Sequence, residues 1–66
     1  MGTPMNSTAT YYAAGMKAGI AVQRHDMSLY NRLADWYRRA SRLENDTDKV
    51  EAGTYWDQGY HAGRHS

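Results

Sequence analysis

The chain has 66 residues, with eight Lys and Arg, seven Asp and Glu, and no cysteine. A chain of this length forms one domain at most and buries only about 60% of the surface that its unfolded form exposes, so its stability depends on unusually close packing, oligomerisation or a partner. The lack of cysteine excludes disulfides and thiolate zinc sites, and a net charge of +1 provides no bulk attraction to nucleic acid or to an anionic membrane.

The first predicted element is a flexible N-terminal arm over residues 1–8, where glycine, proline and small polar residues occur without apolar periodicity. Residues 9–66 are expected to form a single helical domain. Its first helix is predicted at roughly 8–24, with Thr8 or Thr10 as the N-cap. Each glycine inside this helix costs about 0.5–1 kcal/mol relative to alanine, so the helix should depend on its neighbours for support.

The second helix is predicted at roughly 27–44, with Asp26 or Ser28 as its N-cap, and it is the best-defined element of the chain. One half of its helical wheel is apolar and should face the core: Leu29, Tyr30, Leu33, Ala34, Trp36, Tyr37, Ala40 and Leu43. The other half is polar and rich in arginine: Asn31, Arg32, Asp35, Arg38, Arg39 and Arg42. This pattern predicts a core helix with one solvent-facing side.

The third helix is predicted at roughly 48–64, where Asp48 and Glu51 resemble a capping box with an acidic cap residue. Its broad apolar face should carry the following residues: Val50, Ala52, Tyr55, Trp56, Gly59, Tyr60, Ala62 and Gly63. Short connections favour antiparallel neighbours, so the first and third helices should be parallel to each other. The expected fold is all-α, a small three-helix up-down-up bundle.

An internal repeat links the first and third helices. Residues 10–19 recur as residues 54–63, with threonine, tyrosine, alanine and two glycines at the same five places. Both copies contain Gly-x-x-x-Gly, a spacing that clears one strip of a helix and lets another helix approach closely. The predicted helix-packing residues are Gly15, Ala18, Gly19, Gly59, Ala62 and Gly63. Packing within one chain and packing across a homodimer both fit this pattern, and a chance repeat is the alternative to both.

Aromatic and arginine residues are the candidates for binding. The chain has six tyrosines, two tryptophans and no phenylalanine, and three short helices cannot hide all of these rings. Tyr, Trp and Arg are enriched at binding hot spots. The predicted binding residues are Tyr12, Tyr55, Trp56, Tyr60, Arg32, Arg38, Arg39 and Arg42. The alternatives are that the arginines serve solubility and that the rings wall the core from outside.

No catalytic chemistry is predicted. The chain has no nucleophile elbow, phosphate loop or paired carboxylates in an apolar setting, and it is too small to enclose a typical substrate pocket. Asp57, His61 and His65 are spaced four apart on one helical face, but a fraying terminus and the lack of a fourth ligand argue against a metal site. We therefore expect neither an enzyme nor a cofactor.

By elimination, the sequence favours a small interaction protein that binds a larger macromolecular partner, a protein in the first instance, and blocks or modulates it. Its size is typical of phage or mobile-element accessory proteins that inhibit a host complex. Nucleic-acid binding through the arginine face, and a structural oligomer or assembly factor, are the alternatives. Because no apolar stretch approaches the roughly 20 residues that span a bilayer and no signal segment opens the chain, we expect a cytoplasmic protein, in the host cytoplasm if viral.

Overall fold

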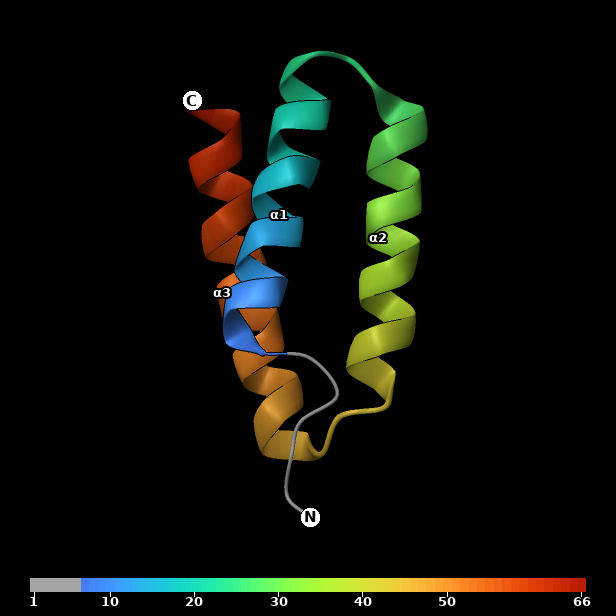
Figure 1. Cartoon of the computed structure of the whole chain (residues 1–66), viewed down its shortest axis with the longest axis vertical. Helices are drawn as coiled ribbons and strands as arrows, with labels where there is room; N and C mark the ends of the chain where they lie inside the picture. Colours follow the sequence, from blue (N-terminus) through green and yellow to red (C-terminus); the bar gives the residue numbers. More distant parts are fainter. Residues whose placement is uncertain (1–6) are drawn as a thin grey trace.

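The computed structural model describes residues 7–66, which form three α-helices in the order α1 (Thr8–Gln23), α2 (Met27–Arg42) and α3 (Asp46–Arg64). α1 and α3 run in the same direction and α2 runs against them (Figure 1). The predicted all-α three-helix bundle is therefore confirmed. Most of the predicted N-terminal arm falls on residues 1–6, which lie outside the described residues.

α1 begins directly after Ser7, whose side chain is the N-cap. Ser7 Oγ accepts a hydrogen bond from the Thr10 amide at 3.2 Å. The predicted cap at Thr8 or Thr10 is therefore wrong, because both threonines lie inside the first turn, where their amides themselves need acceptors. Serine and threonine are both good caps, so residue type alone could not choose among the three.

The connection between α1 and α2 is a Schellman motif at His25, which has a left-handed φ of 61°. The His25 amide donates to the Val22 carbonyl at 3.0 Å, and the Asp26 amide donates to the Ala21 carbonyl at 2.7 Å. Asp26 then caps α2, as predicted, by accepting a hydrogen bond from the Leu29 amide at 3.1 Å. One residue thus closes the first helix and opens the second, which makes the two helices antiparallel neighbours.

α3 begins at Asp46, two residues earlier than predicted, with Asn45 as its N-cap. Asn45 Oδ1 accepts from the Asp48 amide at 2.8 Å, and Asn45 Nδ2 donates to Asp48 Oδ2 at 3.0 Å. The predicted capping box of Asp48 and Glu51 is therefore wrong, because Asp48 is the third helical residue and the partner of the cap. Asp46 and Asp48 also place negative charge at the positive end of the helix dipole.

Asn45→Ala should lower the free energy of unfolding by about 1 kcal/mol, because the Asp48 amide loses its acceptor. Thr47→Ala is the control, since Thr47 is exposed in the same turn and has no capping bond. Urea denaturation followed by circular dichroism measures both changes. Equal losses for the two variants would show that Asn45 is not the cap.

Glycines leave the contact between α1 and α3 without side chains at four positions. These two helices form the closest pair of the bundle. A Cβ added at Gly15 would collide with the carbonyl oxygen of Trp56 and would lie 2.9 Å from its carbonyl carbon. A Cβ added at Gly59 would collide in the same way with the carbonyl oxygen of Tyr12. The backbones of the two helices are therefore nearly in contact, and only glycine fits at these positions.

The same arrangement recurs one turn further along both helices. Cβ atoms added at Gly19 and Gly63 would collide with the carbonyl oxygens of Tyr60 and Met16, respectively. Each contact of an α1 glycine with a residue of α3 has an equivalent contact of an α3 glycine with a residue of α1. The equivalent residues stand at the same places in the two copies of the repeat. α1 and α3 are thus related by a local twofold axis that runs parallel to them.

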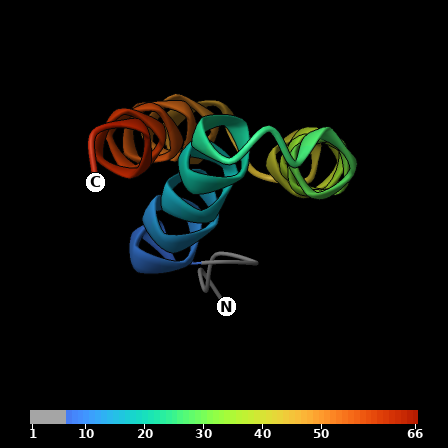
Figure 2. The ribbon, with the colours of Figure 1, turned by 90° about the horizontal axis from the view of Figure 1, so that it is seen from above.

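α2 packs on one side of this pair and contacts α1 much more than α3 (Figure 2). The buried apolar residues are few, and most are alanines: Tyr11, Ala18, Ala21, Ala40 and Ala52. Tyr11 is the largest fully buried side chain, and its ring centroid lies 5.6 Å from that of Trp36 and 6.0 Å from that of Tyr37. Tyr11 is therefore the main large side chain that α1 buries against α2.

Two residues that were predicted on apolar faces are instead largely exposed. Leu43, the residue that follows α2, is 66% exposed, and Val50, in the second turn of α3, is 70% exposed. Helical periodicity alone placed both residues on the apolar side. The end of α2 and the narrow contact between α2 and α3 leave them outside the core.

Candidate interaction surface

The four rings of the predicted binding surface are divided between two faces of the α1–α3 pair. Trp56 stacks on Tyr37 of α2, with ring centroids 4.6 Å apart and an interplanar angle of 22°. The Tyr60 ring centroid lies 6.2 Å from that of Tyr30, which is also on α2. Both rings therefore help to hold α2 in place.

Tyr12 and Tyr55 lie on the opposite face of the pair. The local twofold axis makes Tyr12 the counterpart of Trp56 and Tyr55 the counterpart of Tyr11, but α2 covers only one of the two faces. Tyr55 is 38% exposed and Tyr12 is half-buried. The structure therefore does not bring the four predicted rings together into one surface.

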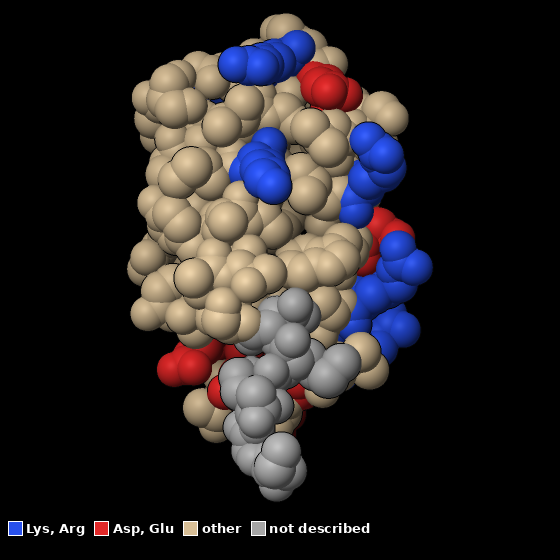
Figure 3. All heavy atoms as spheres, viewed as in Figure 1, with Lys and Arg blue, Asp and Glu red and all other residues tan. Residues whose placement is uncertain are grey.

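The predicted arginine surface is exposed along α2, at the edge where blue spheres gather in Figure 3: Arg32, Arg38, Arg39 and Arg42. Asp35 lies among them, with Oδ2 2.7 Å from Arg39 and Oδ1 3.5 Å from Arg38. No ion pair forms at Arg32 or Arg42 within residues 7–66. The outer side of α2 is therefore a cationic surface.

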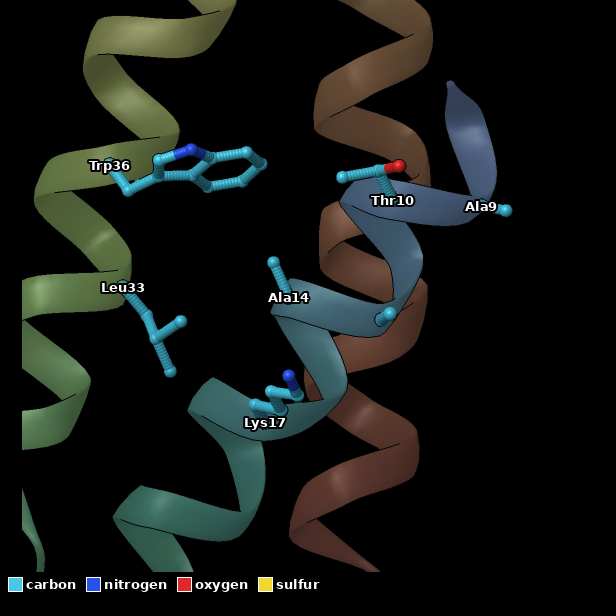
Figure 4. Close-up of a pocket in the computed structure, with 7 residues that line it drawn as sticks. Ala9, Thr10, Ala14, Lys17, Leu33 and Trp36 are labelled. Carbon is cyan, nitrogen blue, oxygen red and sulfur yellow. The ribbon is translucent and has the colours of Figure 1, made fainter. Parts of the chain in front are cut away.

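An open groove of about 480 Å³ runs between the N-terminal half of α1 and the middle of α2 (Figure 4). Its lining is mostly apolar: Ala9, Thr10, Ala13, Ala14, Lys17, Leu33 and Trp36. Leu33 and Trp36 extend from α2 toward α1, and Ala14 faces them across the groove. The walls therefore combine alanine methyl groups on α1 with two large side chains on α2.

Sequence reasoning missed this groove. The sequence predicts Trp36 and Leu33 on the apolar face of the second helix, and it spaces Ala9, Ala13 and Lys17 four residues apart in the first. That spacing places the three residues on one side of α1, which is a weak signal. A groove exists there only because α2 packs beside α1 and leaves this side open.

Glu44 is a buried polar residue that sequence reasoning also missed. It follows α2 in the connection to α3 and is only 8% exposed. Tyr11 Oη donates a hydrogen bond to Glu44 Oε2 at 2.8 Å, which ties α1 to this connection. This contact between residues far apart in the chain stabilises the bundle and is not part of the candidate interaction surface.

The face of α3 that carries two histidines shows no metal-binding geometry. His61 Nε2 lies 3.6 Å from Asp57 Oδ1, and His65 follows the last residue of α3. Within the part of the chain that the structure describes, no group of three His, Asp or Glu side chains could hold a metal ion.

No helix in residues 7–66 has the length and apolar character that crossing a membrane requires. Comparison with protein-family models, with curated proteins and with solved structures finds no match. The candidate interaction surface is therefore identified from the structure alone, by the groove between α1 and α2 and the arginines beside it.

Proposed function

We propose that this chain is a small non-enzymatic interaction protein that binds a larger macromolecular partner and blocks or modulates it. The observation that supports the proposal is the cationic side of α2 next to an apolar groove that contains Trp36 and Leu33. Arginine and tryptophan are the residue types most enriched at binding hot spots. The length of the chain fits an accessory inhibitor of a host complex, of phage or mobile-element origin, that acts in the host cytoplasm.

A protein is the favoured partner because the surface combines positive charge with an apolar groove. Arginines supply directional hydrogen bonds and long-range attraction to carboxylates, whereas the groove offers an area from which water can be expelled. Nucleic-acid binding is the second candidate, favoured by Arg32 and Arg42, which make no ion pair within residues 7–66. Phosphate binding would use the arginines and leave the groove empty.

Arg32→Glu should weaken capture of the partner by at least about tenfold, whereas Lys49→Glu should leave capture unchanged. Both variants change the net charge equally and both residues are exposed, but Lys49 lies on α3, away from the groove. The tagged full chain would be incubated with a lysate of its native host after nuclease treatment, and the retained proteins would be quantified by mass spectrometry.

Two results would argue for the alternatives. Loss of all specific capture after nuclease treatment, with binding that weakens by orders of magnitude between low and moderate salt, would indicate a nucleic-acid partner. A mass that rises with concentration in sedimentation experiments, without any captured partner, would indicate a homodimer or larger assembly.

A further inference from the structure

We propose that the groove between α1 and α2 binds an α-helix of a partner protein, and that this helix presents an apolar stripe flanked by Asp or Glu. The inference rests on the proposed function and adds the structural and chemical class of the partner. Three features of the groove carry it: the backbone that surrounds it, the shape of its lining, and the positive charge of Lys17 in the lining and of the arginines nearby on α2.

The surrounding backbone favours a helix over an extended segment. Most of the lining residues lie within the bodies of α1 and α2, where amides and carbonyls are already bonded within the helices, and only Ala9 and Thr10 belong to the first turn of α1. An extended segment in the groove would bury its own amides without acceptors, which is costly. A helix satisfies its backbone internally and buries only side chains, as in other helix-in-groove complexes.

The lining fits the ridge of a helix about two turns long. Ala9 to Lys17 span eight helical steps, or about 12 Å at the rise of an α-helix. Methyl groups at Ala13 and Ala14 let another backbone approach closely, and Trp36 offers a large apolar wall. The approaching ridge must therefore carry small or medium apolar side chains at intervals of three and four residues.

The cations at the groove and beside it select acidic flanks. Lys17 lies at the groove on α1, and on α2 Arg32 and Arg39 lie about one turn before and after Trp36. No ion pair forms at Lys17 or Arg32 within residues 7–66, whereas Arg39 is bonded to Asp35 at 2.7 Å. Glutamates on either side of the apolar ridge would meet these cations, and a basic helix would be repelled.

A nucleic acid fits the groove less well than a helix. Bases bind to exposed ring faces or to hydrogen-bonding groups, but most of the wall on α1 consists of alanine methyl groups. The ring of Trp36 is half-buried and packs against Tyr11, with centroids 5.6 Å apart. The apolar lining would contribute nothing to phosphate binding, so the groove points to protein.

Three synthetic helical peptides with blocked ends would test the proposal against the isotope-labelled full chain by NMR. The first carries leucine and alanine on one stripe with glutamate on both flanks, the second has lysine in place of glutamate, and the third is a scrambled form of the first without a stripe. We expect saturable shifts of the Trp36 indole and the Ala13 and Ala14 amides with the first peptide only. The Trp56 indole, which stacks on Tyr37 away from the groove, should remain unshifted.

Two variants locate the binding site. Ala13→Glu should abolish binding because it fills the groove with a like charge, and the chain should still fold because Ala13 is exposed. Thr54→Glu is the matched control, with the same change in net charge at an exposed position of α3, and it should bind as the parent does. Lys17→Glu should weaken binding roughly three- to tenfold.

The proposal is overturned if the acidic peptide causes no saturable shift, if all three peptides bind equally, or if Ala13→Glu binds normally. Shifts of the groove residues with a single-stranded oligonucleotide but not with the acidic peptide would overturn it in favour of nucleic acid. If host capture depends on Arg32 while the acidic peptide does not bind, this inference fails and the proposed function stands.

Discussion

Gly59→Ala is expected to destabilise the chain by about 1–3 kcal/mol, although alanine is the better helix former. The added methyl group would collide with the carbonyl oxygen of Tyr12, and its other near neighbours are also backbone atoms of α1. Backbone cannot move aside as a flexible side chain can, so α1 and α3 must separate, and overpacking of this kind costs about 1–3 kcal/mol or more. The gain in helix propensity offsets only about 0.5–1 kcal/mol.

Gly59→Leu should leave the chain unfolded. A domain of 66 residues has a stability of roughly 3–10 kcal/mol, at about 0.05–0.15 kcal/mol per residue. A leucine at this position removes the contact between α1 and α3, which is the largest in the bundle. Circular dichroism should therefore show loss of helix together with loss of a cooperative thermal transition.

Gly53→Ala is the matched control, because Gly53 lies in the same helix but outside the strip. Its added Cβ would meet only the Tyr37 hydroxyl at 3.1 Å, and this end of a side chain can shift by a few tenths of an ångström. The expected change in stability is within about 1 kcal/mol, since the gain in helix propensity opposes the slight crowding. If Gly59→Ala and Gly53→Ala melt alike, α1 and α3 are not in backbone contact.

The local twofold axis between α1 and α3 allows a quantitative test with the glycine variants. Gly15→Ala and Gly59→Ala should cost nearly the same, because each added methyl meets the equivalent carbonyl oxygen of the other helix. The double variant should cost less than the sum, since the first methyl already separates the helices. Strict additivity would indicate that the two positions do not share one interface.

The repeat predicted close helix packing at the glycine strips, but it left packing within one chain and packing across a homodimer both open. In the structure the two strips pack against each other within the chain, with Gly15 against the backbone of Trp56 and Gly59 against the backbone of Tyr12. Helix ends were less predictable. Ser7 and Asn45 compete with nearby residues of similar capping strength, and the winner depends on where tertiary packing starts the first turn.

The candidate site was only partly predictable. Periodicity found the exposed arginines of α2, because it reports which side of one helix is polar. It could not separate Trp56, which packs on α2, from Tyr55, which α2 leaves uncovered, because that difference depends on the face of the pair that α2 occupies. The groove beside Trp36 was unpredictable for the same reason, since its walls come from two helices.

Tyr11→Ala is the second change with a large expected effect, a loss of about 3–5 kcal/mol in the free energy of unfolding. Tyr11 is 2% exposed, packs against Trp36 and Tyr37, and donates to Glu44 at 2.8 Å. Most of the remaining core consists of alanines, which cannot move to fill the space that the ring leaves. Urea denaturation should show a lower midpoint, or no folded baseline if the parent is marginally stable.

Tyr55→Ala is a control that the chain itself provides, because Tyr55 occupies the same place in the second copy of the repeat. α2 leaves it 38% exposed, so its removal should cost only about 1 kcal/mol. Tyr11→Phe should cost about 1–3 kcal/mol, because it keeps the ring and removes the hydrogen bond to Glu44. The loss of stability should therefore fall in the order Tyr11→Ala, Tyr11→Phe, Tyr55→Ala. The difference between the two alanine variants measures the stability that packing of α2 adds to one of the two related faces. Equal losses for Tyr11→Ala and Tyr55→Ala would mean that α2 does not pack where the structure places it.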